Sequence, residues 1–114
     1  MTRAELAVAL SYLKGPFAEE ETLRDAIAAT LGGVALREAN VGAHERIDFL
    51  VDKIGIEAKI RGTLSDVTRQ LFRYAECEAI EELVLVTTRF QHTRLPPTIC
   101  GKPLTVVVLW GAML

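Results

Sequence analysis

The chain has 114 residues, of which 50% are hydrophobic and 25% are charged, and its formal net charge at pH 7 is −2. This size suits a single domain over residues 1–114, with one sheet and about three helices. No stretch approaches the roughly 18 apolar residues of a membrane span, and the N-terminus lacks a signal-peptide pattern, so we expect a cytoplasmic protein with no membrane partner.

The cysteine and histidine content excludes several classes of site. The chain has two Cys and two His residues, which are too few and too irregularly spaced for a disulfide framework, an iron–sulfur cluster or a zinc site. We expect no organic cofactor either. The slightly negative net charge argues mildly against nucleic-acid binding, which usually shows as a basic surface.

Two helices are expected before the first strand. Residues 3–14 favour a short amphipathic helix that Gly15-Pro16 ends, and a second helix then runs as far as Gly32-Gly33. The apolar stripe of the second helix predicts that one of its faces packs on the core.

A run of three glutamates opens the second helix. Glu20 stands three residues before Leu23 of the apolar stripe, so it aligns best with the inward face, and Glu19 is nearly as well placed. The ordinary explanation of such a run, which includes Glu21, is a surface that complements the helix dipole.

Residues 34–41 predict the first strand, and an alternating pattern then predicts a β-hairpin. Its apolar positions are Ile47, Phe49 and Val51 in the first arm and Ile56, Ala58 and Ile60 in the second. Because these two stripes should face one core, the opposite face receives Asp48, Glu57 and Lys59. A connecting loop of two or four residues places Asp48 directly opposite Glu57, with Cβ atoms about 5 Å apart.

A three-residue turn with Gly55 as a left-handed bulge is the competing connection. It would send Asp48 and Glu57 to opposite faces of the sheet. It would also split both apolar stripes, and we therefore favour the even-numbered loop.

Two carboxylates at this distance repel one another by roughly 3 kcal/mol at an effective dielectric constant of 20, and a divalent cation resolves the conflict. Carboxylate oxygens, water and a backbone carbonyl are the ligands of Mg²⁺ or Mn²⁺, whereas zinc favours His and Cys. Lys59 is placed to orient or deprotonate a water, or to neutralise charge on a phosphate. The ordinary alternative is a solvated outer face of a half-exposed strand.

Residues 64–79 predict the next helix, with Ser65 or Thr63 as its N-cap. Its buried stripe comprises Val67, Leu71, Tyr74 and Ala75. Gln70 and Tyr74 are four residues apart and share one face, where an amide and a phenol are able to contact a DNA phosphate or the lysine. The alternative is that Tyr74 belongs to the core and Gln70 flanks it.

Residues 83–88 and 104–110 predict two continuously apolar strands that are buried on both faces, separated by a long loop over 89–103. The expected fold is therefore α/β, with a mixed sheet of about five strands flanked by helices. The helix before the first buried strand implies some parallel pairing. His44 and His92 fall in loops and are expected at the surface, with His92 close enough to a strand end to touch substrate.

The hairpin and the helix after it resemble the core of the PD-(D/E)XK nuclease superfamily, which has the restriction-endonuclease-like fold. Asp48 matches the first acidic position of the motif, with isoleucine before it where the motif has proline. Glu57-Ala58-Lys59 matches the second half of the motif.

Two further elements carry the resemblance. The stretch from Gln70 to Tyr74 resembles the QxxxY element that RecB-like exonucleases carry on the helix after the motif strand. Gly62-Thr-Leu-Ser65, followed by Gln70, is similar to the small virus-type replication-repair nucleases and to archaeal-type Holliday junction resolvases.

The resemblance implies a metal-dependent deoxyribonuclease, an endonuclease acting on duplex or branched DNA, with Mg²⁺ or Mn²⁺ as its cofactor. The implied metal ligands are Asp48, Glu57, the Ala58 carbonyl and, from the upstream helix, Glu20. The implied catalytic residues are Asp48, Glu57, Lys59 and Gln70.

Basic side chains gather around the motif in spite of the net charge. Arg61 follows the motif strand, and Arg69 and Arg73 lie on the next helix, so that together with Tyr74 they are candidate contacts to DNA phosphates. Their ordinary explanation is solvated surface balanced by nearby glutamates.

Apolar residues at both ends of the chain exceed the apparent needs of so small a core. They are Leu6, Leu10 and Leu13 near the N-terminus and Trp110, Met113 and Leu114 near the C-terminus. We therefore expect a homodimer, in which two active sites would suit duplex or branched DNA. The alternative function is a catalytically inactive module of the same fold that binds nucleic acid or a protein partner, and cleavage of RNA stays open.

Overall fold

The computed structural model describes residues 1–109, which form three α-helices and one six-stranded sheet. The helices are α1 (Arg3–Ser11), α2 (Glu20–Leu31) and α3 (Leu64–Ala75). The strands are β1 (Leu36–Gly42), β2 (Glu45–Val51), β3 (Ile54–Lys59), β4 (Glu82–Thr87), β5 (Thr98–Ile99) and β6 (Lys102–Val108). Their order in the sheet is β1-β2-β3-β4-β6-β5.

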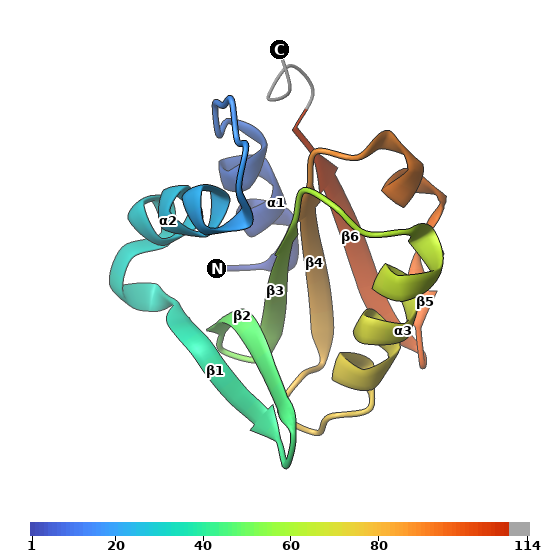
Figure 1. Cartoon of the computed structure of the whole chain (residues 1–114). Coiled ribbons are helices and arrows are strands. Elements are labelled where there is room, and N and C mark those ends of the chain that lie inside the picture. Colours follow the sequence, from blue (N-terminus) through green and yellow to red (C-terminus); the bar gives the residue numbers. More distant parts are fainter. Residues whose placement is uncertain (110–114) are drawn as a thin grey trace.

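The sheet lies between two layers of helices, with α1 and α2 on one face and α3 on the other (Figure 1). Strand β4 shows both cores at once, because Val84 and Val86 pack under α1 and α2 whereas Leu83 and Leu85 pack under α3. Burial on both faces explains the continuously apolar sequence of this strand, as predicted.

The predicted α/β class and mixed sheet are confirmed. Strands β3 and β4, which precede and follow α3 in the chain, pair in parallel, and β4 and β6 are also parallel. The sheet has one strand more than expected, because the predicted loop over 89–103 contains a short 3-10 helix, Phe90–Arg94, and the strand β5. A two-residue strand is too short to carry a visible alternation.

Side-chain caps set where α1 and α3 begin. The Thr2 side chain accepts a hydrogen bond from the Glu5 N–H, and the Glu5 side chain accepts one from the Thr2 N–H, which makes a capping box for α1. Of the two candidate caps for α3, Thr63 is the one used, since its side chain accepts from the Asp66 N–H at 3.0 Å. Both α1 and α3 end a few residues earlier than predicted.

The register of the β2–β3 hairpin is the predicted one. Val51 pairs with Ile54 and Leu50 with Gly55, so that the connection is a two-residue loop. Gly55 therefore serves packing rather than the turn. A Cβ added at Gly55 would lie 2.6 Å from Cδ1 of Ile47, closer than two carbon atoms approach without a clash.

One part of the predicted stripe is wrong, because Ile47 does not share a core with Phe49 and Val51. Phe49 and Val51 pack under α1 and α2, whereas Ile47 packs in the core under α3. The change of core falls at Asp48, where the pairing of β2 with β3 ends and no pair joins β2 to β1 between Arg37–Phe49 and Ala39–Ile47.

Helix α1 also corrects the reasoning behind the expected homodimer. Leu6 and Leu10 are fully buried within the chain, and Leu13 packs against the same core, because α1 lies on β4 and β6. These leucines are therefore not surplus to the core of one subunit. Trp110, Met113 and Leu114, the other part of that reasoning, lie outside the described residues.

No helix within residues 1–109 has both the length and the apolar character that crossing a membrane requires.

Candidate metal and catalytic site

The backbone pairing of β2 with β3 covers the half of the hairpin near its loop and does not include Asp48. Beyond the last pair, acidic side chains link the two strands. The last backbone pair joins Phe49 and Ile56. Beyond that pair, the Asp48 N–H donates to Oε1 of Glu57 at 3.1 Å, and the Ala58 N–H donates to Oδ2 of Asp48 at 2.8 Å. Each carboxylate accepts a hydrogen bond from a backbone N–H of the other strand, and the two acidic groups are held together where the strands part.

The ladder is distorted on the other side of Asp48 as well. In the β1–β2 register, Arg37 pairs with Phe49 and Ala39 with Ile47, but the residue between, Glu38, has a φ of +53°. A non-glycine residue in this left-handed region costs about 1 kcal/mol or more, and such strain gathers at functional sites. The irregularity releases Asp48 from regular pairing on both sides.

Glu57 is the most buried carboxylate of the site, with 4% of its surface exposed. Burial, followed by the charge of Asp48, raises the pKa of Glu57 to about 8. Lys59 opposes this shift, with Nζ at 4.0 Å from Oε2 of Glu57. In the metal-free protein at neutral pH, the pair is therefore relieved by a proton on Glu57.

Asp48 is better supported as an anion than Glu57. Burial raises the pKa of Asp48 overall, and the hydrogen bond from the Ala58 N–H and the guanidinium of Arg24 offset part of this rise. Nη1 of Arg24 lies 3.9 Å from Oδ1 of Asp48. Arg24 is not among the residues predicted for the site, although its position four residues after Glu20 places both on one helix face.

Tyr74 and Gln70 reach the site in a way that differs from the expectation. Tyr74 is 3% exposed, and its hydroxyl lies 3.3 Å from Oε2 of Glu57 and 3.0 Å from the carbonyl oxygen of Arg46. Gln70 donates from Nε2 to this hydroxyl at 3.1 Å. Tyr74 thus belongs to the core, as the alternative had it, and its polar end supports Glu57 rather than standing free for a phosphate.

The donor set around Asp48 fits a hard divalent cation. In a strand, the N–H and C=O of one residue point to the same side, so the Ala58 carbonyl faces the edge where the Ala58 N–H meets Asp48. Two carboxylates and one carbonyl are the oxygen ligands that Mg²⁺ or Mn²⁺ prefers, with water completing the set.

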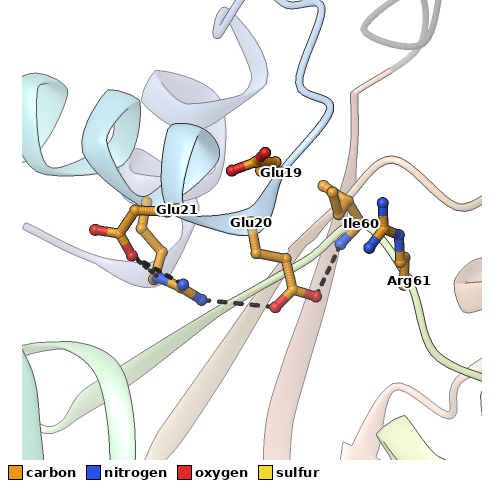
Figure 2. A pocket seen from close by; sticks show the side chains of 6 residues that line it. Glu19, Glu20, Glu21, Ile60 and Arg61 are labelled. Atoms are coloured by element: carbon orange, nitrogen blue, oxygen red, sulfur yellow. Dashed lines mark hydrogen bonds and ion pairs between the residues drawn. The ribbon is translucent and has the colours of Figure 1, made fainter.

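Glu20 lies beside this pair and reaches the end of the motif strand. Its Oε1 accepts from the Ile60 N–H at 3.3 Å, and its Oε2 lies 3.6 Å from Nη1 of Arg24. Figure 2 shows Glu20 pointing to Ile60, while Glu19 and Glu21 point elsewhere. The guanidinium of Arg24 separates Glu20 from Asp48, and within residues 1–109 no three His, Cys, Asp or Glu side chains gather as a metal site.

A hollow of about 490 Å³ opens between the start of α2 and the end of β3. Its lining comprises Glu19, Glu20, Glu21, Arg24, Ile60 and Arg61. Figure 2 shows Arg61 beside Ile60, across the hollow from Glu19 and Glu20. Of the predicted DNA contacts, Arg61 is the one that lines this hollow.

Arg69 and Arg73 lie on a different surface. Arg69 forms an ion pair with Asp66, and Arg73 forms one with Glu45 at 3.2 Å. Together with Phe72 they line a groove of about 310 Å³ on the outside of α3.

The expectation that His92 lies at the surface is wrong. Its side chain is 0% exposed, with Nδ1 2.7 Å from Oγ1 of Thr87 and Nε2 3.1 Å from the carbonyl oxygen of Gly62. Because a carbonyl only accepts, Nε2 carries the proton, and burial lowers the pKa of this neutral imidazole. His92 thereby ties the loop that carries Arg61 to the end of β4. His44 is exposed, as expected.

Comparison of this chain with family models, with curated proteins and with solved structures gives no match.

Proposed function

We propose that this chain is a metal-dependent deoxyribonuclease of the PD-(D/E)XK type, an endonuclease that hydrolyses phosphodiester bonds of duplex or branched DNA. The observation that carries the proposal is the pair of hydrogen bonds holding Asp48 and Glu57 together at 3.1 and 2.8 Å, where β2 and β3 part. A fold gains little from two mutually repelling buried carboxylates, whereas a divalent cation uses both.

The arrangement of elements supports the same proposal. The two motif halves lie on β2 and β3, the helix with Gln70 and Tyr74 follows β3, and the helix with Glu20 precedes β1, β2 and β3. This is the order that the resemblance implies. The side-chain contacts add to it, because Glu20 and Tyr74 approach the motif strand from opposite faces of the sheet.

Asp48, Glu57 and the Ala58 carbonyl would hold Mg²⁺ or Mn²⁺, and Glu20 would join them once Arg24 has moved. A divalent ion bound there supplies Lewis-acid polarisation of the phosphodiester and a water of lowered pKa. Tyr74 supports one oxygen of Glu57 through its hydroxyl, and Gln70 orients that hydroxyl from the solvent side. Both are positioning residues.

Lys59 would act on the attacking water. Its side chain is 20% exposed and its Nζ lies 4.0 Å from Oε2 of Glu57, so the ammonium lies beside the Glu57 carboxylate and also meets the solvent. There it would orient the water for attack and neutralise charge that develops on the phosphate. Arg61, at the rim of the hollow, would hold a neighbouring phosphate.

The experiment that tests this function is a cleavage assay on labelled linear, nicked, flapped and branched DNAs, with a matching RNA. With Mn²⁺ or Mg²⁺ we expect cleavage of at least one duplex or branched DNA, and with EDTA none. No cleavage of any substrate with either metal would contradict the proposal. Cleavage of RNA alone would change the proposed substrate from DNA to RNA.

A catalytically inactive module of the same fold is the second candidate, and one observation favours it. A proton on Glu57 and the guanidinium of Arg24 beside Asp48 already relieve the carboxylates. Calorimetric titration with Mn²⁺ separates the two candidates, because an inactive module would bind no metal whereas the nuclease would.

We also propose a homodimer, now without the support of the N-terminal leucines, because two sites related by a two-fold axis suit the cutting of both strands. Light scattering at micromolar concentration should give twice the mass of the chain. A monomer would remove this part and leave the nuclease proposal intact.

A further inference from the structure

A positively charged side chain already lies between the carboxylates that the proposed function assigns to a metal. Nη1 of Arg24 is 3.6 Å from Oε2 of Glu20 and 3.9 Å from Oδ1 of Asp48. Both distances exceed the 2.7–3.2 Å of a good N–H···O hydrogen bond. The attraction at this end of the guanidinium is therefore Coulombic, without directional bonds to hold it in place.

The other end of the same guanidinium is firmly held. Nε and Nη2 of Arg24 both donate to Oε2 of Glu21, at 3.1 and 2.9 Å. Glu21 in turn accepts from Nη2 of Arg37 on β1 at 2.7 Å. In Arg24, Nε and Nη2 are thus fixed by hydrogen bonds, whereas Nη1, which lies near Asp48 and Glu20, is not.

The hollow is less negative with a metal than without one. Its lining carries three carboxylates, on Glu19, Glu20 and Glu21, and two guanidiniums, on Arg24 and Arg61, which give a formal charge of −1. A divalent cation beside Glu20 adds two positive charges, and the Asp48 and Glu57 carboxylates that would hold it offset part of this increase. A phosphate is therefore repelled less by the metal-loaded hollow than by the empty one.

We infer that Arg24 is the resident counter-ion of Asp48 and Glu20, that a divalent metal displaces it, and that the displaced guanidinium then binds a substrate phosphate in the hollow. This inference rests on the proposed function and deepens it, because it makes DNA binding depend on metal occupancy. Arg24 lines the hollow, so the exchange needs only a turn of the side chain about the hydrogen-bonded Nε and Nη2.

A structural role for Arg24 predicts the opposite effect on metal binding. If the guanidinium serves to hold Asp48 in place, its removal makes the carboxylate more mobile and lowers the affinity for the metal. If it competes with the metal, its removal strengthens metal binding. The sign of the change therefore separates the two roles.

The first experiment is a calorimetric titration of metal-free protein with Mn²⁺ for the wild type, Arg24→Gln, Arg24→Lys and Lys53→Gln. Arg24→Gln should bind Mn²⁺ about tenfold more tightly, since it removes a cation about 4 Å from two carboxylates. Arg24→Lys keeps the charge and should stay near the wild type. Lys53→Gln removes one positive charge at the far end of the hairpin, where Lys53 pairs with Glu81, and should also stay near the wild type.

The second experiment measures the anisotropy of a labelled DNA duplex with saturating Mn²⁺, in a Lys59→Gln background in which we expect cleavage to be impaired. Adding Arg24→Gln should weaken DNA binding several-fold even though the metal binds more tightly. Unchanged DNA affinity would overturn the phosphate-binding half of the inference. Circular dichroism confirms that each variant is folded.

The outcomes distinguish this inference from the function on which it rests. If the wild type binds Mn²⁺ and Arg24→Gln binds it equally or more weakly, the exchange is wrong and the nuclease proposal stands. If neither the wild type nor Arg24→Gln binds Mn²⁺, both are wrong.

Discussion

The backbone N–H of Asp48 donates to the Glu57 carboxylate, and the Asp48 carboxylate accepts from the residue after Glu57. This exchange ties two acidic side chains to each other's strands at the point where the strands separate. It fixes their mutual position without help from solvent-exposed side chains. The pair is therefore held ready for a cation, and its stability should respond to anything that changes its charge.

The first prediction concerns pH. Glu57 has a pKa of about 8 in the folded protein, against 4.5 for a glutamate in the unfolded chain, so between these pH values the folded state binds a proton that the unfolded state does not. The stability that this proton contributes is therefore fully present below about pH 4.5 and is lost as the pH rises through 8. In the metal-free protein the free energy of unfolding should fall by about 3 to 5 kcal/mol over this range. Urea denaturation in EDTA at pH 5.5, 7 and 8.5 measures this loss.

The matched control is Glu57→Gln, whose side chain does not ionise. Its stability should change much less than that of the wild type across the same window. Parallel pH profiles for the two proteins would refute the assignment of the proton to Glu57.

The second prediction concerns the Tyr74 hydroxyl, which lies 3.3 Å from Glu57. Tyr74→Phe keeps the buried ring and removes the hydrogen bond, so Mn²⁺ affinity should fall about tenfold while the free energy of unfolding falls by about 1 kcal/mol. Calorimetry and urea denaturation provide the two values. Tyr12→Phe, at a position that is 75% exposed, should change neither.

A loss of stability in Tyr74→Phe with unchanged Mn²⁺ affinity would assign the hydroxyl to the Arg46 carbonyl alone. In that case Tyr74 would be a core residue without a part in the site.

The third prediction concerns Gly55. A methyl group there would lie 2.6 Å from Cδ1 of Ile47 and 3.1 Å from Cδ1 of Ile80, both in a closely packed core. Gly55→Ala should therefore lower the free energy of unfolding by about 1 to 3 kcal/mol. Gly33→Ala, where nothing lies within 4 Å of the added carbon, serves as the control, and equal stabilities of the two variants would contradict this packing.

Much of the fold follows from patterns that the sequence displays openly. Alternation in both hairpin arms gave the register, since the turn that would split the stripes is absent and Val51 pairs with Ile54. Continuous apolar runs predicted β4 and β6 as buried strands. These predictions succeeded because burial leaves a strong periodic signal over several residues.

The failures have a common physical cause, which is that the deciding contacts are distant along the chain. Ile47 lies in the other core, next to Asp48, which does not pair with Glu38 opposite it, and Glu38 has a positive φ. His92 is buried because its ring meets Gly62, thirty residues earlier. Neither event leaves a local pattern.

The candidate site divides along the same line. Asp48, Glu57 and Lys59 lie on adjacent strands of one hairpin, so local register brought them together. Arg24 is different, because its meeting with Asp48 depends on how α2 packs against β3. The four-residue spacing of Glu20 and Arg24 indicates that they share a helix face, but it does not indicate which strand that face lies against.

The most direct test of the central claim compares metal-dependent DNA cleavage by the wild type and by Asp48→Asn, which keeps an oxygen to accept from the Ala58 N–H. With saturating Mn²⁺ the wild type should cleave, Asp48→Asn should lose at least about a hundredfold in rate, and Lys53→Gln should cleave like the wild type. Undiminished cleavage by folded Asp48→Asn would contradict the account.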